Sequence, residues 1–457
     1  MSTGSTNAAS YGVLLRLAWP IVLSRASQAV IGFTDAVMIA PLGEDAVAAT
    51  TTGASNTLNL FILPMGIVFI VQSFASQLAG SGEAAGARRY AWYGLAIAAA
   101  TAVLSGFATL GVAPTLGMLG YTDTVRDLLT EYMVIRLLSA GAVVGIEAIG
   151  SWYGGLGNTR LPMLVSFGAM VMNIALNWVF IYGNLGAPQL GVAGAALASA
   201  LTSWLAFAIL ALMFARRVGV AETGPRGRLR LDELVRMLRF GLPNGLNWFL
   251  EFAAFTFFIN AVVSTLGTTA VAALMAVIQV NSIAFMPAFG LASAGAILVG
   301  TAIGRGAHDE VPTIVRRTGT VAAGWQGFVG IVYASMPAAV MGMFASDTVS
   351  SDALVALGTS MLLVSTAWQL FDALAITLSE ALRAAGDTAW CMWARVALAW
   401  VLFVPLAAWA VLVVDVGALG AIATFVVYLA ALAGLLWWRF GGGAWRKIDL
   451  TGRGPGH

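Results

Sequence analysis

Long apolar stretches recur from one end of this chain to the other, and no other feature restricts its fold so strongly. A helix needs about 20 apolar residues to cross the hydrocarbon core of a bilayer, and lipid tolerates only structures that satisfy their own backbone hydrogen bonds. The sequence therefore predicts an all-α polytopic membrane protein with twelve transmembrane helices. Their approximate bounds are 14–41, 50–79, 89–115, 126–155, 161–183, 192–215, 237–265, 271–303, 313–345, 354–384, 389–414 and 418–438.

Composition supports this class and argues against several others. The chain is 60% hydrophobic and 10% charged, whereas soluble domains carry about 25% charged residues. Its single cysteine, Cys391, rules out an internal disulfide, and its two histidines, His308 and His457, argue against a histidine-ligated metal enzyme. No HExxH, GxSxG or Cys/His pair is present. We therefore expect neither an enzyme nor a cofactor, and no nucleic-acid partner.

One long polar stretch divides the chain into two halves of six spans. We predict an N-lobe at 1–216, a cytoplasmic linker at 217–235, a C-lobe at 236–440 and a cytoplasmic tail at 441–457. Basic residues in short loops mark the cytoplasmic side of a membrane protein. The residues assigned to this side are Arg88, Arg89, Arg160, Arg216, Arg217, Arg226, Arg228, Arg230, Arg305, Arg316, Arg317, Arg446 and Lys447, against essentially only Arg126 on the other. Both termini are therefore expected on the cytoplasmic side of a bacterial inner membrane.

The two halves repeat each other at an offset of 224 residues. The octapeptide LGEDAVAA of the first half matches LGTTAVAA of the second, and Gly66 corresponds to Gly290. Pro20 and Pro243 open the first span of each half with a shift of one residue. Because each half contains an even number of spans, both enter the membrane from the same side. Parallel repeats of this kind are typical of transporters.

Five carboxylates and three arginines fall inside the apolar spans, where an unpaired charge costs several kcal/mol. Arg25 and Glu147 lie at matching depth from the inner face, when depth is taken from the rise of a helix. Glu380 and Arg395 match each other in the same way. Each couple is therefore interpreted as a structural ion pair.

Three carboxylates, Asp35, Glu251 and Asp372, have no obvious cation as partner. Glu251 and Asp372 lie at nearly equal depth in the second half, and two acids in one dry site share a proton or bind a cation. Asn244 and Asn247 fall on the helical face of Glu251 and add oxygen ligands that suit Na⁺ or a proton relay.

Aromatic side chains accompany these acids and indicate a cavity for an organic cation. Trp248, Phe255 and Phe258 flank Glu251 along its helix, and Trp368 is four residues before Asp372. Aromatic faces attract cations, although the same rings could equally be ordinary core packing.

Asp35 has polar candidates of its own in the first half. Gln28 lies seven residues before it on the same span, and Asn173 and Asn177 lie four residues apart on another span. These amides could bind the Asp35 carboxylate. Polar side chains of this kind also join helices in membranes, so each of them alone could be structural.

At these residues the chain resembles the multidrug and toxic compound extrusion (MATE) family, and it looks most like the NorM-type branch. The likeness is carried by LAWPIVLSRASQAVIGFTDAVMIAPLG (17–43), ASQLAGSGE (75–83), MNIALNWVFIYGNLGAPQLGVAGAALAS (172–199), GLPNGLNWFLEF (241–252) and FDALAITLSEALRAAGDT (371–388). The third segment is the most specific match. The resemblance implies the MATE fold, with twelve helices in two pseudo-symmetric six-helix lobes.

The resemblance also implies a secondary active antiporter that exports cationic amphipathic drugs and dyes against inward flow of Na⁺ or H⁺, and so contributes to antibiotic resistance. It implies Asp35 as the coupling residue of the N-lobe, and Glu251 and Asp372 as those of the C-lobe. Glu380 departs from the family pattern: it either pairs with Arg395 or adds a third acid to the C-lobe site. We expect a monomer in the lipid bilayer.

Other functions remain open at this point. A flippase or exporter of a lipid-linked or natural-product substrate could share a related fold, although phosphate groups favour a more cationic cavity. A major facilitator transporter also has two parallel six-helix halves, but its basic loop with an Asp-Arg core is absent from GSGEAAGARR. A channel or an intramembrane enzyme fits repeated lobes with buried acids less well.

Overall fold

Helices make up the regular structure of this chain. The computed structural model describes residues 10–221, 227–344 and 349–452, and every regular element in this part is helical. Nine helices in these ranges are long and apolar enough to cross a membrane, and a tenth span results if the bent pair α5 (Asp123–Leu137) and α6 (Ala140–Gly155) is one span. Each of the twelve predicted spans coincides with a helix or an interrupted helix. Arg226 of the predicted linker, and His457, lie outside the described residues.

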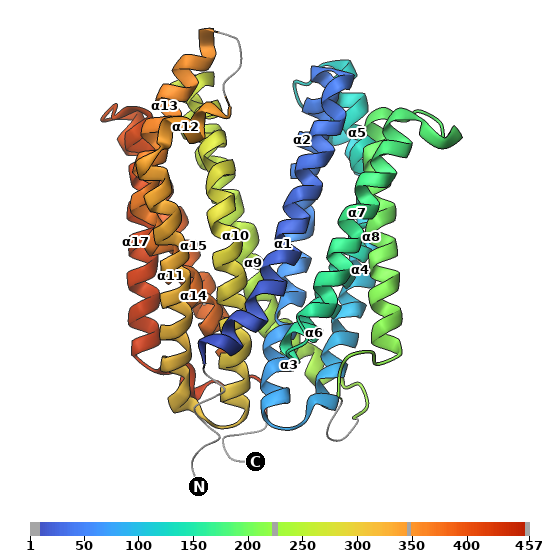
Figure 1. The fold of residues 1–457 in the computed structure, drawn as a ribbon, viewed down its shortest axis with the longest axis vertical. Helices are drawn as coiled ribbons and strands as arrows, with labels where there is room; N and C mark the ends of the chain where they lie inside the picture. The colour runs from blue at the N-terminus through green and yellow to red at the C-terminus, as the bar shows by residue number, and fades with distance from the viewer. Residues whose placement is uncertain (1–9, 222–226, 345–348, 453–457) are drawn as a thin grey trace. The chain divides into compact units, whose positions relative to one another are not determined.

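The helices form two compact units. Unit 2 runs from Leu23 to Gly245, and unit 1 combines the chain up to Val22 with the chain from Leu246 onward. In unit 2, α4 packs against α6, and α7 packs against α8 (Figure 1). The elements that lie wholly in unit 2 are α2 (Glu44–Phe69), α3 (Val71–Gly80), α4 (Ala84–Gly117), α5, α6, α7 (Arg160–Tyr182) and α8 (Gly191–Ala215).

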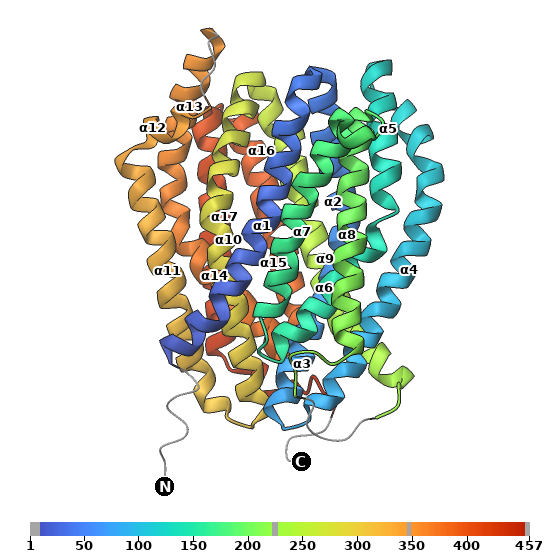
Figure 2. The same ribbon diagram turned by 45° about the vertical axis from the view of Figure 1, so that its right-hand side comes forward.

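Unit 1 is built around α10 (Thr268–Gly304) and α14 (Gln369–Ala385), which pack against each other and against α11 (Val311–Ser335) (Figure 2). A large buried core, which includes Phe258, Val277 and Leu378, stabilises this unit. Its other helices are α12 (Pro337–Gly342), α13 (Val349–Ser365), α15 (Thr388–Ala397), α16 (Val404–Leu412) and α17 (Gly417–Gly441).

The first helix of each half contributes to both units. Helix α1 (Tyr11–Ile39) passes from unit 1 to unit 2 after Val22, two residues beyond Pro20. Helix α9 (Leu231–Phe257) passes from unit 2 to unit 1 after Gly245, two residues beyond Pro243. A proline inside a helix removes one backbone hydrogen bond and favours a bend. Each unit therefore corresponds to one repeated half, except at its first helix. The part of α1 up to Val22 belongs to unit 1, and the part of α9 up to Gly245 belongs to unit 2.

A glycine on the second span of each half makes close contact with these exchanged segments. A Cβ added at Gly66 of α2 would lie 2.6 Å from the Cα of Gly245, and a Cβ added at Gly290 of α10 would lie 2.5 Å from a methyl carbon of Val22. Gly66 and Gly290 differ by 224 residues, and Val22 and Gly245 differ by 223, the shift that also separates Pro20 from Pro243. The repeat therefore extends to this backbone contact, which excludes a side chain at both glycines.

The segment after α17, which the sequence predicts as a cytoplasmic tail, packs against unit 1 as far as residue 452. Trp445 is 2% exposed, Leu450 is 0% exposed, and Leu450 packs against the glycine turn at Gly386. Arg446 forms an ion pair with Asp309 at 3.1 Å. This segment is therefore part of unit 1.

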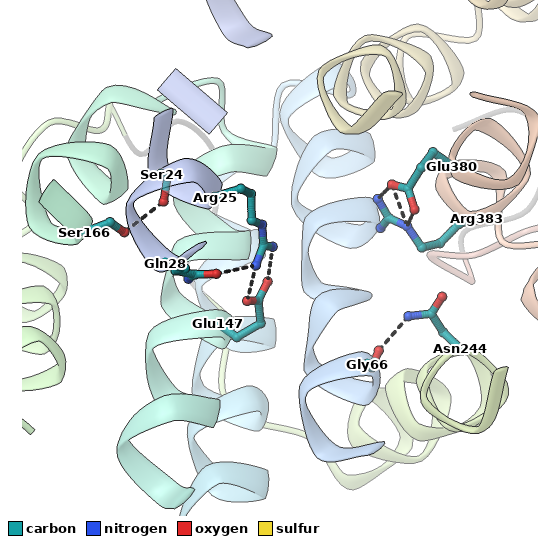
Figure 3. A network of polar contacts seen from close by, with 9 residues as sticks. All are labelled: Ser24, Arg25, Gln28, Gly66, Glu147, Ser166, Asn244, Glu380 and Arg383. Carbon is teal, nitrogen blue, oxygen red and sulfur yellow. Dashed lines mark hydrogen bonds and ion pairs between the residues drawn. The ribbon is translucent and has the colours of Figure 1, made fainter. Parts of the chain in front are cut away.

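Figure 3 shows two of the ion pairs, one in each unit. Arg25 donates to both carboxylate oxygens of Glu147, at 3.1 and 3.3 Å, and its Nη1 also donates to Gln28 at 3.4 Å. This confirms the predicted Arg25–Glu147 pair. In unit 1, Arg383 Nη2 lies 2.5 Å from Glu380 Oε2, and both side chains are at least nine-tenths buried.

The predicted pairing of Glu380 with Arg395 is wrong. Residues three apart on a helix share a face, so Arg383 of α14 reaches Glu380 without help from another helix. Glu380 is therefore already neutralised by a cation of its own helix, which argues against its alternative role as a third acid in the C-lobe site.

We expect Gly66→Val and Gly290→Val to destabilise the folded protein, because each side chain would push two helix backbones apart. Overpacking of this kind costs about 1–3 kcal/mol. Thermal unfolding in detergent measures the loss. The matched control is Gly106→Val on α4, because a Cβ at Gly106 meets nothing within 4 Å. An equal loss of stability in all three variants would contradict this explanation. It would show that replacing a glycine destabilises the protein whether or not another helix is close.

We expect Arg25→Ala to reduce the folded yield, because it leaves the buried Glu147 without a counter-charge. Removing one partner of a buried pair costs roughly 3–5 kcal/mol. The double variant Arg25→Gln/Glu147→Gln should recover most of the yield, because it removes both charges together. Arg126→Ala is the control, because its partner Asp123 is 87% exposed and exposed pairs contribute about 0–1 kcal/mol. Equal yields for Arg25→Ala and the control would exclude a structural role for the pair.

Candidate functional site

A buried hydrogen-bond network surrounds Asp35 near the end of α1. Asn177 of α7 donates its Nδ2 to Asp35 Oδ1 at 2.5 Å, and Ser199 of α8 donates its Oγ to Asp35 Oδ2 at 3.2 Å. Asn173 donates to Ser199 at 3.1 Å and accepts from Asn177 at 3.2 Å. The structure confirms that Asn173 and Asn177 lie beside Asp35. It adds Ser199, whose position in a small-residue helix gave no signal in the sequence.

The donors at Asp35 are neutral, so its charge is solvated but not cancelled by direct contact. The Oδ1 atom of Asn177 is also buried, and no hydrogen-bond donor among the described residues reaches it. Carboxylate and amide oxygens at one position are ligands that hard cations prefer. The Asp35 network could therefore hold a proton on the carboxylate or a small cation beside it.

Two other residues of unit 2 bear on this network. Arg136 lies at the break between α5 and α6, donates to Ser139 at 3.3 Å, and exerts an electrostatic attraction on Asp35. Gln28, predicted as part of the Asp35 site, is exposed and instead accepts from Arg25. The prediction for Gln28 is wrong, because the side chain three residues before it on the same helix is a stronger partner.

In unit 1, Glu251 is paired with Arg395. The Arg395 Nη1 atom donates to both oxygens of Glu251, at 2.7 and 2.9 Å, and Tyr428 donates its hydroxyl to Glu251 at 3.0 Å. Arg395 Nη2 donates to Ser379 at 2.9 Å. The expectation that Glu251 lacks a cation is therefore wrong, whereas Arg395 is indeed an ion-pair residue as predicted, with a different acid.

Asp372 has a neutral partner instead. Gln326 of α11 donates its Nε2 to Asp372 Oδ2 at 2.7 Å, and Asp372 lies within electrostatic range of both Arg395 and Glu251. One turn earlier on the chain, Gln369 donates to Asn281 of α10 at 2.6 Å. Asp372 therefore belongs to a group of polar side chains from α10, α11 and α14. Asp35 belongs to a similar group in unit 2, from α1, α7 and α8.

The helices that carry these charges in unit 1 are interrupted close to them. A π-helical segment (η3, Phe258–Val262) follows α9, another (η7, Leu398–Phe403) follows α15, and a 3₁₀ turn (η6, Thr366–Trp368) precedes α14. Such interruptions are frequent at functional sites, and in membranes they are tolerated where protein or a cavity surrounds the backbone. The segment η7 begins three residues after Arg395, η6 ends four residues before Asp372, and η3 begins seven residues after Glu251.

The aromatic residues predicted to line a substrate cavity belong mainly to the core. Phe258 is 1% exposed and Trp368 is 8% exposed. The ring of Trp368 lies 5.0 Å from that of Phe425, which is also 5.9 Å from Phe255. Of the two alternatives that the sequence left open for these rings, Phe258 and Trp368 therefore take the second, packing in the core. Trp248 is half-buried on α9.

The polar face predicted for α9 is divided between the two units. Asn244 lies in unit 2, where its Nδ2 donates to the carbonyl oxygen of Gly66 at 2.7 Å (Figure 3). Asn247 lies in unit 1 with Glu251, and its buried Oδ1 has no donor among the described residues. Asn244 is therefore a helix-contact residue, and the expectation that it belongs to the Glu251 site is wrong.

Among the described residues, no three His, Cys, Asp or Glu side chains converge as a metal-binding group. Two groups of residues are therefore candidates. One is Asp35 of unit 2, with neutral amide and hydroxyl donors, and the other is Asp372 of unit 1, with a neutral amide donor and the Glu251–Arg395 pair within electrostatic range. Each group can bind and release a proton or a monovalent cation.

Comparisons with known proteins agree with this architecture. The sequence model of the MatE family matches residues 20–179 and 246–409. The chain is 28% identical to the multidrug resistance protein NorM of Burkholderia vietnamiensis over 435 residues, which cover 93% of this chain and 92% of that protein. It is 32% identical to a probable multidrug resistance protein NorM of Neisseria meningitidis serogroup A over 304 residues, or 64% of each protein.

The fold is shared with solved structures as well. A crystal structure of MATE in complex with MaL6 matches with a TM-score of 0.84 at 21% identity, over 95% of this chain and 97% of that chain. Because the family match covers more than half of the sequence in two segments, one in each repeated half, and the fold agrees, this chain is an integral membrane protein of the MatE family of transporters.

Proposed function

We propose that this chain is a multidrug efflux transporter that exports cationic amphipathic compounds in exchange for Na⁺ or H⁺. One observation supports this most strongly. Glu147, Glu251 and Glu380 are each paired with an arginine, whereas Asp35 and Asp372 accept hydrogen bonds from the neutral side chains of Asn177, Ser199 and Gln326. Asp35 and Asp372 are therefore the acids whose charge a coupling ion can cancel.

The proposed cycle uses this charge directly. With Asp35 and Asp372 ionised, the protein attracts a cationic drug; when a proton or Na⁺ neutralises them, the attraction is lost and the drug dissociates. A ligand can shift a conformational equilibrium only through its different affinity for the two states. Competition between drug and ion for the same negative charge provides this difference. The protein would work by rocker-type alternating access, as a monomer in a bacterial inner membrane with both termini in the cytoplasm.

Transport of an anionic lipid-linked substrate is less well supported. A phosphate-bearing head group would need unpaired cations in the site. Arg25, Arg383 and Arg395 are each in contact with a carboxylate, and the charge of Arg136 is attracted electrostatically by Asp35. The names of the relatives from Burkholderia and Neisseria also point to drug efflux, and this chain shares their family.

The test is ethidium efflux from proteoliposomes with a Na⁺ gradient or a pH gradient imposed separately. We expect efflux by the unmodified protein under at least one gradient, and its loss to the protein-free background in Asp35→Asn and in Asp372→Asn. The control is Asp123→Asn, whose side chain is 87% exposed, and it should keep the full rate. Efflux that ignores both gradients, or that persists in both site variants, would refute the proposal.

A further inference from the structure

In unit 1 the guanidinium of Arg395 lies against Glu251, one of the carboxylates that the family resemblance implies as a coupling residue. Arg395 Nη1 donates to both carboxylate oxygens of Glu251, at 2.7 and 2.9 Å, and the hydroxyl of Tyr428 donates to Glu251 at 3.0 Å. The guanidinium also donates to Ser379 Oγ at 2.9 Å. It is thus surrounded by carboxylate and hydroxyl oxygens, which are the ligands of a hard cation.

From this geometry we propose that Arg395 determines which ion the transporter can use: its guanidinium excludes Na⁺ from Glu251 and leaves Asp372 as the single ion-exchanging carboxylate of unit 1. The inference rests on the proposed antiport. It assigns Arg395 a positioning role, because the arginine acts through the charge of Glu251 and not through contact with the transported drug.

Electrostatics explains why Na⁺ and the guanidinium exclude each other. The pair is already neutral, so a second cation gains no net attraction from Glu251. Two positive charges about 4 Å apart at an effective dielectric constant of about 20 repel strongly enough to weaken binding about a thousandfold. Arginine also keeps its charge at any pH that the protein meets. Ordinary changes of pH therefore do not break its ion pair with Glu251.

The surroundings hold the guanidinium in place. Arg395 extends from α15, Glu251 from α9, Ser379 from α14 and Tyr428 from α17. All four residues belong to unit 1, so the arrangement does not require the other unit. The Arg395 side chain is 14% exposed and the Glu251 side chain is 34% exposed, so the guanidinium is the more buried member of the pair.

Asp372 is affected differently. It lies within electrostatic range of both members of the pair, which act on its charge in opposite directions. Its hydrogen-bond partner, Gln326, is neutral. The charge of Asp372 is therefore not cancelled by direct contact with an arginine, and a proton or a cation that binds there can neutralise it.

The experiment measures Na⁺ binding to the purified full-length protein, without drug or gradient. Thermal unfolding is followed in NaCl and in choline chloride of equal ionic strength. We expect Arg395→Leu to acquire a Na⁺-specific stabilisation with at least a tenfold higher apparent Na⁺ affinity than the unmodified protein, because the oxygens of Glu251, Tyr428 and Ser379 become available. The double variant Arg395→Leu/Glu251→Gln should lose this gain. Arg395→Lys keeps the fixed charge and should bind Na⁺ no better than the unmodified protein.

A purely structural pair would lower the stability of Arg395→Leu equally in both salts, and that result would overturn the proposal. A second comparison decides the matter even if Arg395→Leu does not fold. Glu251→Gln should leave the Na⁺ response of the unmodified protein unchanged, whereas loss of a Na⁺ response in this variant would show that Glu251 binds Na⁺ beside Arg395. Because no transport is measured, failure here is distinct from failure of drug efflux in proteoliposomes.

Discussion

The cost of placing a charge in an apolar interior controls the arrangement of this protein. Charged groups in a membrane survive when a counter-ion, a hydrogen-bond network or a bound ion compensates them. Glu147 and Glu380 are each paired with an arginine: the Arg25–Glu147 pair joins α1 to α6, and the Arg383–Glu380 pair lies within α14. Asp35 and Asp372 have neutral donors, which solvate a carboxylate without cancelling its charge. The difference between these two kinds of partner separates the structural acids from those that can respond to an ion.

Internal repetition gives each unit the same basic plan. Each unit has one acid with an amide donor, one arginine within electrostatic range of that acid, and a glycine on its second span that contacts an exchanged helix segment. The two units differ in the partner of this arginine. In unit 1 the nearby arginine is bound to a second acid, Glu251, whereas in unit 2 Arg136 donates to the neutral Ser139. Two units of common origin could therefore differ in the ions that they exchange.

The spans and one ion pair could be predicted from the sequence, because both depend only on the position of a residue along the axis of a helix. Apolar length predicted the spans, and depth along a helix predicted the Arg25–Glu147 pair. Depth does not give the direction in which a side chain points, so Arg395 was paired with Glu380 although Glu251 is its partner. The place of Asn244 depended on the exchange of helix segments between units, which no local pattern reveals. The aromatic side chains of Phe258 and Trp368 have the same sequence signature whether they line a cavity or fill a core.

Competition between the drug and the coupling ion at Asp35 and Asp372 is the central claim, and equilibrium binding of a fluorescent cationic dye to the purified protein tests it most directly. The account predicts that raising the proton or Na⁺ concentration weakens dye binding to the unmodified protein. It also predicts that the double variant Asp35→Asn/Asp372→Asn binds dye with an affinity independent of both ions. An unmodified protein whose dye affinity ignores both ions, while its efflux still depends on a gradient, would contradict the account.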